Sequence, residues 1–291
     1  MKKIIFILVL ISISFTSVLA QAAFNTKAFA VEKSGQGPVV LFIPGLACSG
    51  AVWQETVAAL SQNYECHVLT LAGFAGQPSL EQPSLQTVRD EIIRYIKANN
   101  LEQPILIGHS LGGFLSMWIA SLQPGLLQKV LIVDSLPFLS AAMMPDITQA
   151  QAKAQAERMT QMMLAQNEEQ YAVGQKMTLR NMITETDDQI TALQWSLASD
   201  RPTVAAAMQE LMTTDLREQI ATVEIPMLVL GAWYAGKDYG MTEASTQQLY
   251  EAQYAKAPNC EVRMAATAKH FIMMDEFDWY LQEVTSFLEQ Q

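Results

Sequence analysis

The sequence predicts an α/β protein with a doubly wound, mostly parallel sheet and an inserted helical segment. Short apolar runs, typical of strands covered on both faces, alternate with segments of helical spacing up to residue 134 and again after residue 223. The run 104–109 ends in a glycine-flanked serine and leads into a helical segment. Residues 135–223 keep helical spacing and contain no run typical of a strand. These three observations together define the predicted architecture.

The apolar runs and the helical spacings give the expected order of elements. Strands are expected at 24–31, 39–43, 66–71, 104–109, 129–134, 225–231 and 261–264. Helices are expected at 54–60, 85–98, 114–122, 242–255 and 277–288. Because strands and helices alternate, the strands should run parallel, in a sheet of about seven or eight strands.

The first 22 residues have the pattern of a signal peptide. Lys2 and Lys3 precede an apolar run to about Leu19, and the small residues of Ala20-Gln21-Ala22 follow, so that cleavage after either alanine fits. The apolar run is slightly short for an uncleaved membrane anchor. We expect export to the periplasm or the medium, with no stable membrane anchor once the leader is removed.

The remaining chain divides into a core at 23–134 and 224–291 and a helical cap at 135–223. Nine of the chain's 16 methionines fall in the cap. Methionine adapts to apolar ligands, although ordinary packing of short helices explains most of these residues. Phe138, Met143 and Met144 are expected to line an apolar entrance for a small or medium apolar ester, with Leu139 and Trp195 as further candidates.

Composition excludes several classes of partner and cofactor. The net charge is −11, and no run of lysine or arginine exceeds a pair, which argues against nucleic acid and anionic membranes as partners. No histidine or cysteine cluster has metal-ligand spacing, and the glycines at 73–76 lack the spacing of a dinucleotide fingerprint. We expect no metal and no organic cofactor. The sequence carries no signal for an oligomeric state.

The strand–turn–helix at 104–122 carries the strongest chemical signal. Gly108-His109-Ser110-Leu111-Gly112 has the G-x-S-x-G spacing, in which small residues two before and two after a serine let the chain double back sharply. The turn places Ser110 at the start of a helix, where free N–H groups favour an oxyanion. Ser110 is therefore the expected nucleophile.

A serine needs a base, and the chain has three histidines. His109 adjoins the nucleophile, and its side chain should point elsewhere, whereas His67 begins an early strand at the wrong edge of the sheet. His270 follows the last strand, at the carboxyl edge where ligands bind, and is the expected base. The oxyanion should accept backbone N–H groups from Leu111 and from Leu46, which follows an early strand.

These motifs, in this order, resemble the α/β-hydrolase superfamily, in particular its serine-nucleophile members with a helical cap. The resemblance rests on the elbow, the Pro44-Gly45-Leu46 turn, the strand 225–231 and the late Lys269-His270-Phe271 loop, and it spans essentially the mature chain. It implies an α/β-hydrolase fold and acyl chemistry at Ser110. One departure is Pro44-Gly45 where the family usually has His-Gly, which leaves the donor N–H in place.

The second departure concerns the acid that orients the histidine. The family usually places it three residues after the glycine that ends the seventh strand, and that position is Tyr234 here. Asp238 lies a few residues later in the same loop and is the preferred candidate. Asp134, at the end of the preceding strand, is the alternative, although an aspartate there is often only structural.

The sequence thus predicts a carboxylesterase-like serine hydrolase that acts through an acyl-enzyme. Lactone opening, acyl transfer and perhydrolysis use the same serine and remain alternatives. A non-hydrolytic binding protein on this fold is a rival that an intact serine and histidine disfavour. A lipase acting at lipid interfaces is disfavoured by the acidic composition and by the lack of an evident basic amphipathic helix.

Overall fold

A seven-stranded sheet forms the centre of the computed structural model, which describes residues 24–142 and 144–290. The predicted leader and Met143 lie outside the described residues. The strand order is β1-β3-β2-β4-β5-β6-β7; β1 pairs antiparallel with β3, and all other neighbours are parallel. This confirms the predicted fold class. The strands are β1 (Phe29–Ser34), β2 (Val39–Ile43), β3 (Glu65–Leu71), β4 (Ile105–His109), β5 (Val130–Val133), β6 (Met227–Gly231) and β7 (Cys260–Met264).

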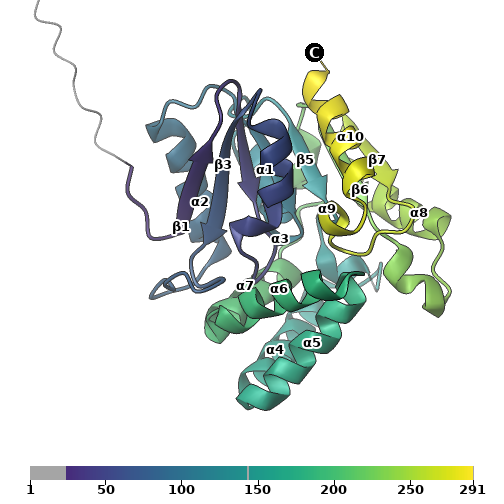
Figure 1. The fold of residues 1–291 in the computed structure, drawn as a ribbon. Coiled ribbons are helices and arrows are strands. Elements are labelled where there is room, and N and C mark those ends of the chain that lie inside the picture. Colours follow the sequence, from purple (N-terminus) through teal and green to yellow (C-terminus); the bar gives the residue numbers. More distant parts are fainter. Residues whose placement is uncertain (1–23, 143, 291) are drawn as a thin grey trace, which may run out of the picture.

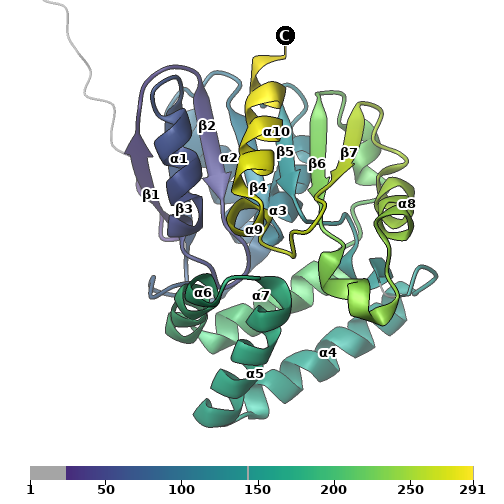
Figure 2. The ribbon, with the colours of Figure 1, turned by 45° about the vertical axis from the view of Figure 1, so that its right-hand side comes forward.

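Helices cover both faces of the sheet, which explains why the central strands are continuously apolar. Ile105 and Ile107 of β4 pack in one cluster with residues of α1 and α10, whereas Leu106 packs in another with residues of α2, α3 and α8. Figures 1 and 2 show these helices on the sheet. They are α1 (Gln54–Leu60), α2 (Leu85–Ala98), α3 (Leu111–Leu122), α8 (Glu243–Tyr254) and α10 (Phe277–Glu289).

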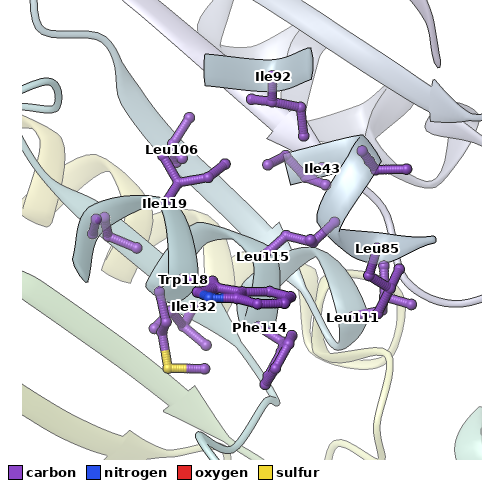
Figure 3. Packing of buried hydrophobic residues seen from close by; sticks show 14 of the residues in the cluster. Ile43, Leu85, Ile92, Leu106, Leu111, Phe114, Leu115, Trp118, Ile119 and Ile132 are labelled. Atoms are coloured by element: carbon purple, nitrogen blue, oxygen red, sulfur yellow. The ribbon is translucent and has the colours of Figure 1, made fainter. Parts of the chain in front are cut away.

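The central helix α3 is apolar on nearly all sides and is correspondingly buried. Its residues Phe114, Leu115 and Ile119 are fully buried in a cluster that includes Ile43 and Ile132 of the sheet (Figure 3). Each such side chain stabilises the fold by about 1.5–3 kcal/mol through its removal from water. The first turn of α3, beside Ser110, is therefore held in place by tight packing against the sheet.

Four further helices follow between β5 and β6, and no strand lies among the described residues of that stretch. Helix α4 packs against α7, and α5 packs against α6. Figures 1 and 2 show them gathered at one end of the sheet. Backbone hydrogen bonds from Asp200 to Gly73 after β3, and from Phe271 after β7 to Met182, place them at its carboxyl end. Their bounds are α4 (Gln149–Ala165), α5 (Glu168–Met182), α6 (Thr186–Ala198) and α7 (Arg201–Thr213).

Several boundaries differ from the sequence-based expectation. Strand β1 begins five residues later, because antiparallel pairing of Phe29–Ser34 with β3 buries Phe29 in the core. Helix α3 begins at Leu111, directly after the serine. A short helix α9 (Ile272–Asp275) lies between the last strand and α10, where no helix is expected from the sequence. The described residues also contain four short 3-10 helices: η1 (Gly50–Trp53), η2 (Leu139–Ala142), η3 (Gln219–Thr222) and η4 (Tyr234–Tyr239).

The three cysteines are free thiols. Burial raises the pKa of Cys48 and of Cys260 to about 12, and that of Cys66 to about 11. A thiol with so high a pKa stays protonated and is a poor nucleophile. None of the three cysteines is therefore a candidate nucleophile.

Candidate active site

Ser110 stands at the sharp turn between β4 and α3. Its backbone adopts φ 52° and ψ −116°, a conformation that non-glycine residues rarely adopt. The turn is held because the N–H of Ser110 donates to the carbonyl of Val133 at 2.8 Å, and its own carbonyl accepts from Phe114 N at 3.0 Å. The strained serine is thus fixed by the neighbouring strand and by the first turn of the helix.

The flanking glycines are required by close backbone approach. A Cβ on Gly108 would lie 2.3 Å from the carbonyl oxygen of Gly112. A Cβ on Gly112 would lie 2.1 Å from the carbonyl oxygen of Ile43 and 2.8 Å from that of Pro44. Any larger residue at either place would push the elbow away from the sheet. The G-x-S-x-G spacing is therefore explained by the close backbone contacts at Gly108 and Gly112.

The predicted oxyanion donors belong to two segments that adjoin Ser110. The turn that contains Leu46 follows β2 and lies against the elbow, since a Cβ on Gly45 would be 3.3 Å from Cβ of Ser110. Leu111 is the first residue of α3, so its N–H has no partner within the helix. Both donors are backbone groups at the edge of the sheet that carries Ser110.

His270 follows β7, and its partner is Asp134. His270 Nδ1 lies 2.6 Å from Asp134 Oδ2, with both side chains mostly buried. The second carboxylate oxygen, Oδ1, accepts hydrogen bonds from Ala232 N at 2.7 Å and from Tyr250 Oη at 2.6 Å. Because Nδ1 faces a carboxylate, it carries the proton, and Nε2 is left as the basic nitrogen.

The preference for Asp238 as the partner of His270 needs correction. The loop after β6 winds into the 3-10 helix η4, closed by a hydrogen bond from Gly236 N to Trp233 O, and Asp238 there is exposed to solvent. The carboxylate that reaches the histidine belongs to Asp134, the alternative. Asp134 has φ 48°, and this sharp turn directly after β5 lets its side chain reach the histidine.

The side chain of His109 is buried and contacts His270. The sequence predicts only that this side chain points away from the Ser110 hydroxyl. Its Nε2 donates to the carbonyl of His270 at 3.1 Å, and its ring centroid lies 4.6 Å from those of both His270 and Phe271. Burial and the neighbouring His270 lower the pKa of His109 well below its usual value, so it stays neutral. His67, in β3, is buried between Glu65 and Tyr95, as the reasoning that excluded it implies.

A small cavity opens at the serine and the histidine. Its volume is about 130 Å³, and its lining is Ser110, Asp134, Ser135, Leu136, Leu139, Leu211, Tyr250 and His270. The segment between β5 and β6 contributes Leu139 from η2 and Leu211 from α7. A larger open groove of about 970 Å³, beside β1 and the loop after β3, contains none of these side chains.

Most of the residues that the sequence predicts to bind substrate do not line this cavity. Phe138 is buried in a separate apolar cluster with Ala141, Ile147 and Ala152. Met144 is 46% exposed and borders a surface depression at α4, and Trp195 packs on the α1/α10 side of the core. Of these candidates only Leu139 lines the cavity. Leu136, Leu211 and Tyr250 were missed, because each is an ordinary apolar or aromatic residue in a helical or loop segment.

Among the described residues, the Ser110 hydroxyl and the His270 imidazole both line the cavity but form no hydrogen bond with each other. Hydrogen bonds between catalytic groups are often long in free enzymes and shorten when substrate binds. Within residues 24–142 and 144–290, no three or more His, Cys, Asp or Glu side chains are grouped as metal ligands. Nor does any helix of these residues have the length and apolarity to span a bilayer.

Several known proteins are similar to this chain in sequence or in fold. A pimeloyl-[acyl-carrier protein] methyl ester esterase of Vibrio atlanticus is 26% identical over 263 residues, which cover 88% of this chain and 96% of that protein. An esterase from Thermogutta terrifontis superposes with a TM-score of 0.73 at 18% identity, covering 89% of this chain and 92% of that one. The enol-lactonase of Burkholderia xenovorans gives 0.71 at 15% identity, covering 90% and 96%. At these identities the two solved structures show the fold alone.

The decisive comparison is with the family as a whole. Residues 40–283 match the model of the alpha/beta hydrolase family, a span that runs from β2 into α10 and includes Ser110, Asp134 and His270. The match confirms the resemblance seen in the elbow and the late histidine loop. The chain belongs to the alpha/beta hydrolase family.

Proposed function

We propose that this protein is a serine esterase that hydrolyses small carboxylic esters through an acyl-enzyme. The observation that carries the proposal is the meeting of Ser110, His270 and Asp134 at one cavity, with His270 Nδ1 2.6 Å from Asp134 Oδ2. A nucleophile, a base and an acid that orients the base are the parts that acyl transfer requires. The names of the relatives, which are ester hydrolases, support the same class of reaction.

In this proposal each group has a role. Ser110 Oγ attacks the ester carbonyl carbon while its proton passes to His270 Nε2, and the oxyanion accepts the N–H groups of Leu46 and Leu111. Collapse breaks the bond to the alcohol, which takes the proton from His270. Water, deprotonated by His270, then attacks the acyl-enzyme, and Ser110 regains its proton as the carboxylic acid leaves. Asp134 holds the tautomer with the proton on Nδ1 and stabilises the imidazolium.

The size of the cavity supports a small group beside the nucleophile. Its volume of about 130 Å³ is well below the range of about 300–1,000 Å³ that drug-sized ligands occupy. Leu136, Leu139 and Leu211 make its walls apolar. We therefore place a short acyl or alkyl group there. A methyl group is the alkyl part of the esters that the names of the relatives give.

Export remains part of the proposal. It is supported by the lysine pair, the apolar run and the small residues at 20–22, all outside the described residues. The test is the mass of the protein recovered from outside the cytoplasm of an expressing bacterium. A chain that begins after Ala20 or Ala22 is expected, and a full-length chain retained in the cytoplasm would contradict export.

Hydrolysis of a series of p-nitrophenyl esters tests the proposed reaction. The mature protein should turn over the acetate with a higher kcat/KM than the octanoate, and Ser110→Ala should lower kcat by about 10³-fold or more. A wild-type protein that is inert and unlabelled by a fluorophosphonate would instead indicate a binding protein on this fold. Adding an alcohol, a lactone or peroxide and analysing the products separates hydrolysis from the other reactions of the same acyl-enzyme.

A further inference from the structure

The turn between α5 and α6 is fastened to the loop that carries His270. Phe271 N donates to the carbonyl of Met182 at 3.2 Å. The ammonium of Lys269 donates to the carbonyls of Arg180 at 3.0 Å and Ile183 at 3.2 Å, at the end of α5. A lysine that binds the last carbonyls of a helix also interacts favourably with the helix dipole. The residues on both sides of His270 thus contact the cap.

Asp275, the last residue of α9, joins the two segments. Its Oδ1 accepts from Thr184 N at 2.9 Å, and its Oδ2 accepts from Thr184 Oγ1 at 3.0 Å and from Lys269 N at 2.8 Å. One partly buried carboxylate therefore binds the α5–α6 turn and the residue before His270 at once. Hydrogen bonds to an ionised acceptor are shorter and stronger than bonds between neutral groups.

His270 itself has two further hydrogen-bond partners. Asp134 holds the imidazole through Nδ1, and His109 donates to the His270 carbonyl. Neither contact fixes the path of the backbone before the histidine. Two carboxylates hold that stretch of backbone: Glu276 accepts from Ala266 N and from Thr267, and Asp275 accepts from Lys269 N, the residue next to the histidine. A displacement of about 1 Å at a catalytic group can lower the rate by about 100-fold, so such a brace matters for the reaction.

We propose that Asp275 is a positioning residue for His270, bracing the histidine loop against the α5–α6 turn of the cap. The proposal rests on the proposed function, since it treats His270 as the base. Without the Asp275 carboxylate, the loop loses its link to Thr184, and the imidazole samples positions away from Ser110. The chemistry of His270 is unchanged, but the fraction of time it spends in the reactive position falls.

The test compares Asp275→Ala and Asp275→Asn with Asp278→Ala. Asp278 is an exposed aspartate three residues away, its side chain makes no hydrogen bond to another described residue, and its replacement matches the change in charge. Asp275→Ala should lower kcat for p-nitrophenyl acetate by about 10- to 100-fold, with KM changed by no more than about threefold. Asp275→Asn, whose amide oxygen still accepts, should fall between, and Asp278→Ala should match the wild type.

Proton NMR gives a readout that does not depend on turnover. The Nδ1 proton shared between His270 and Asp134 should give a strongly downfield resonance in the wild type and in Asp278→Ala. It should broaden or vanish in Asp275→Ala. A sharp resonance with kcat within about twofold of wild type would overturn the proposal, and so would a loss carried by KM alone.

Two further arms keep the test decisive. If Asp275→Ala does not fold, Thr184→Ala removes only the hydroxyl donor from an exposed residue, and a smaller loss of kcat with the same broadening is expected. An unchanged kcat and a sharp resonance in that variant would overturn the brace. If the wild type has no esterase activity, the proposed function fails, whereas the resonances of Asp275→Ala and Asp278→Ala still decide whether Asp275 positions His270.

Discussion

Replacing Tyr250 by phenylalanine removes one hydrogen bond from the acid of the proposed triad. The phenol of Tyr250 is 6% exposed and donates to Asp134 Oδ1 at 2.6 Å. Burial and the neighbouring Asp134 raise the pKa of Tyr250 well above its usual value, so the phenol stays a donor at any pH at which the protein is assayed. In the variant, Oδ1 keeps only the N–H of Ala232.

The size of the effect follows from the charge of the acceptor. A hydrogen bond to a charged group contributes about 1.5–3 kcal/mol, and about 1.4 kcal/mol corresponds to a tenfold change in rate. If the bond acts by holding Asp134 against His270, kcat for p-nitrophenyl acetate should fall by about 10- to 100-fold. The Tm should fall by roughly 3–12 °C for a domain of this size.

Tyr254→Phe is the matched control. Tyr254 lies on the same helix, is buried, and donates to the carbonyl of Ser135 at 2.8 Å, a neutral acceptor outside the proposed triad. It should lose about 0.5–1.5 kcal/mol of stability with kcat almost unchanged. Equal values of kcat for Tyr250→Phe and Tyr254→Phe would refute the reasoning, because the bond to Asp134 would then serve stability alone.

Three other outcomes are expected. Asp134→Asn should lower kcat by about 10³- to 10⁴-fold, whereas Asp238→Asn, on an exposed residue, should leave it unchanged; the reverse order in the same esterase assay would restore Asp238 as the acid. Leu211→Ala enlarges the cavity, so the preferred p-nitrophenyl ester should have a longer acyl chain, and the fold should be destabilised by about 2–5 kcal/mol. An unchanged preference for acyl chain length would show that Leu211 does not contact the substrate. The pKa of His109 in the folded protein lies well below its usual 6.5, so the unfolded chain binds a proton at His109 first as the pH falls. The free energy of unfolding should therefore fall as the pH drops below about 6.5, and His109→Phe should lose this part of the pH dependence. Urea unfolding over a pH series in which His109→Phe keeps it would contradict the assignment to His109.

Local signals in the sequence predict Ser110 as the nucleophile and His270 as the base. The G-x-S-x-G spacing depends on contacts within a few residues of Ser110 and on the facing turn at Pro44, and the glycine contacts now account for it. His270 follows by elimination among three histidines and by its place after the last strand. Strand runs such as 39–43 coincide with the structure because strands covered on both faces are continuously apolar.

Local sequence signals do not decide which aspartate is the partner of His270. Asp134 and Asp238 both follow strands that end at the same edge of the sheet, and only the path of each loop determines which carboxylate reaches His270. The loop after β6 winds into η4 and turns Asp238 outward, whereas the positive φ of Asp134 brings its side chain to the histidine. Tertiary packing, and no local pattern, sets both outcomes.

The lining of the cavity at Ser110 could not be predicted from the sequence either. Helical spacing predicts helices at 135–223, but it does not specify which of them lies over Ser110. Leu211 reaches the cavity because α7 is tied to the core, where Glu210 accepts a hydrogen bond from Leu85 N at 3.1 Å. Phe138, much nearer to Asp134 in sequence, turns into a cluster of its own. Long-range contacts of this kind leave no signal in one sequence.

The central claim is that Ser110 carries the acyl group during turnover. The direct measurement is mass spectrometry of peptides from protein quenched in acid while it hydrolyses p-nitrophenyl acetate. An acetyl group on the peptide that contains Ser110, absent from Ser110→Ala, is the expected result. Sustained hydrolysis by the wild type with an acetyl group on another residue, or by Ser110→Ala at the wild-type rate, would contradict the account.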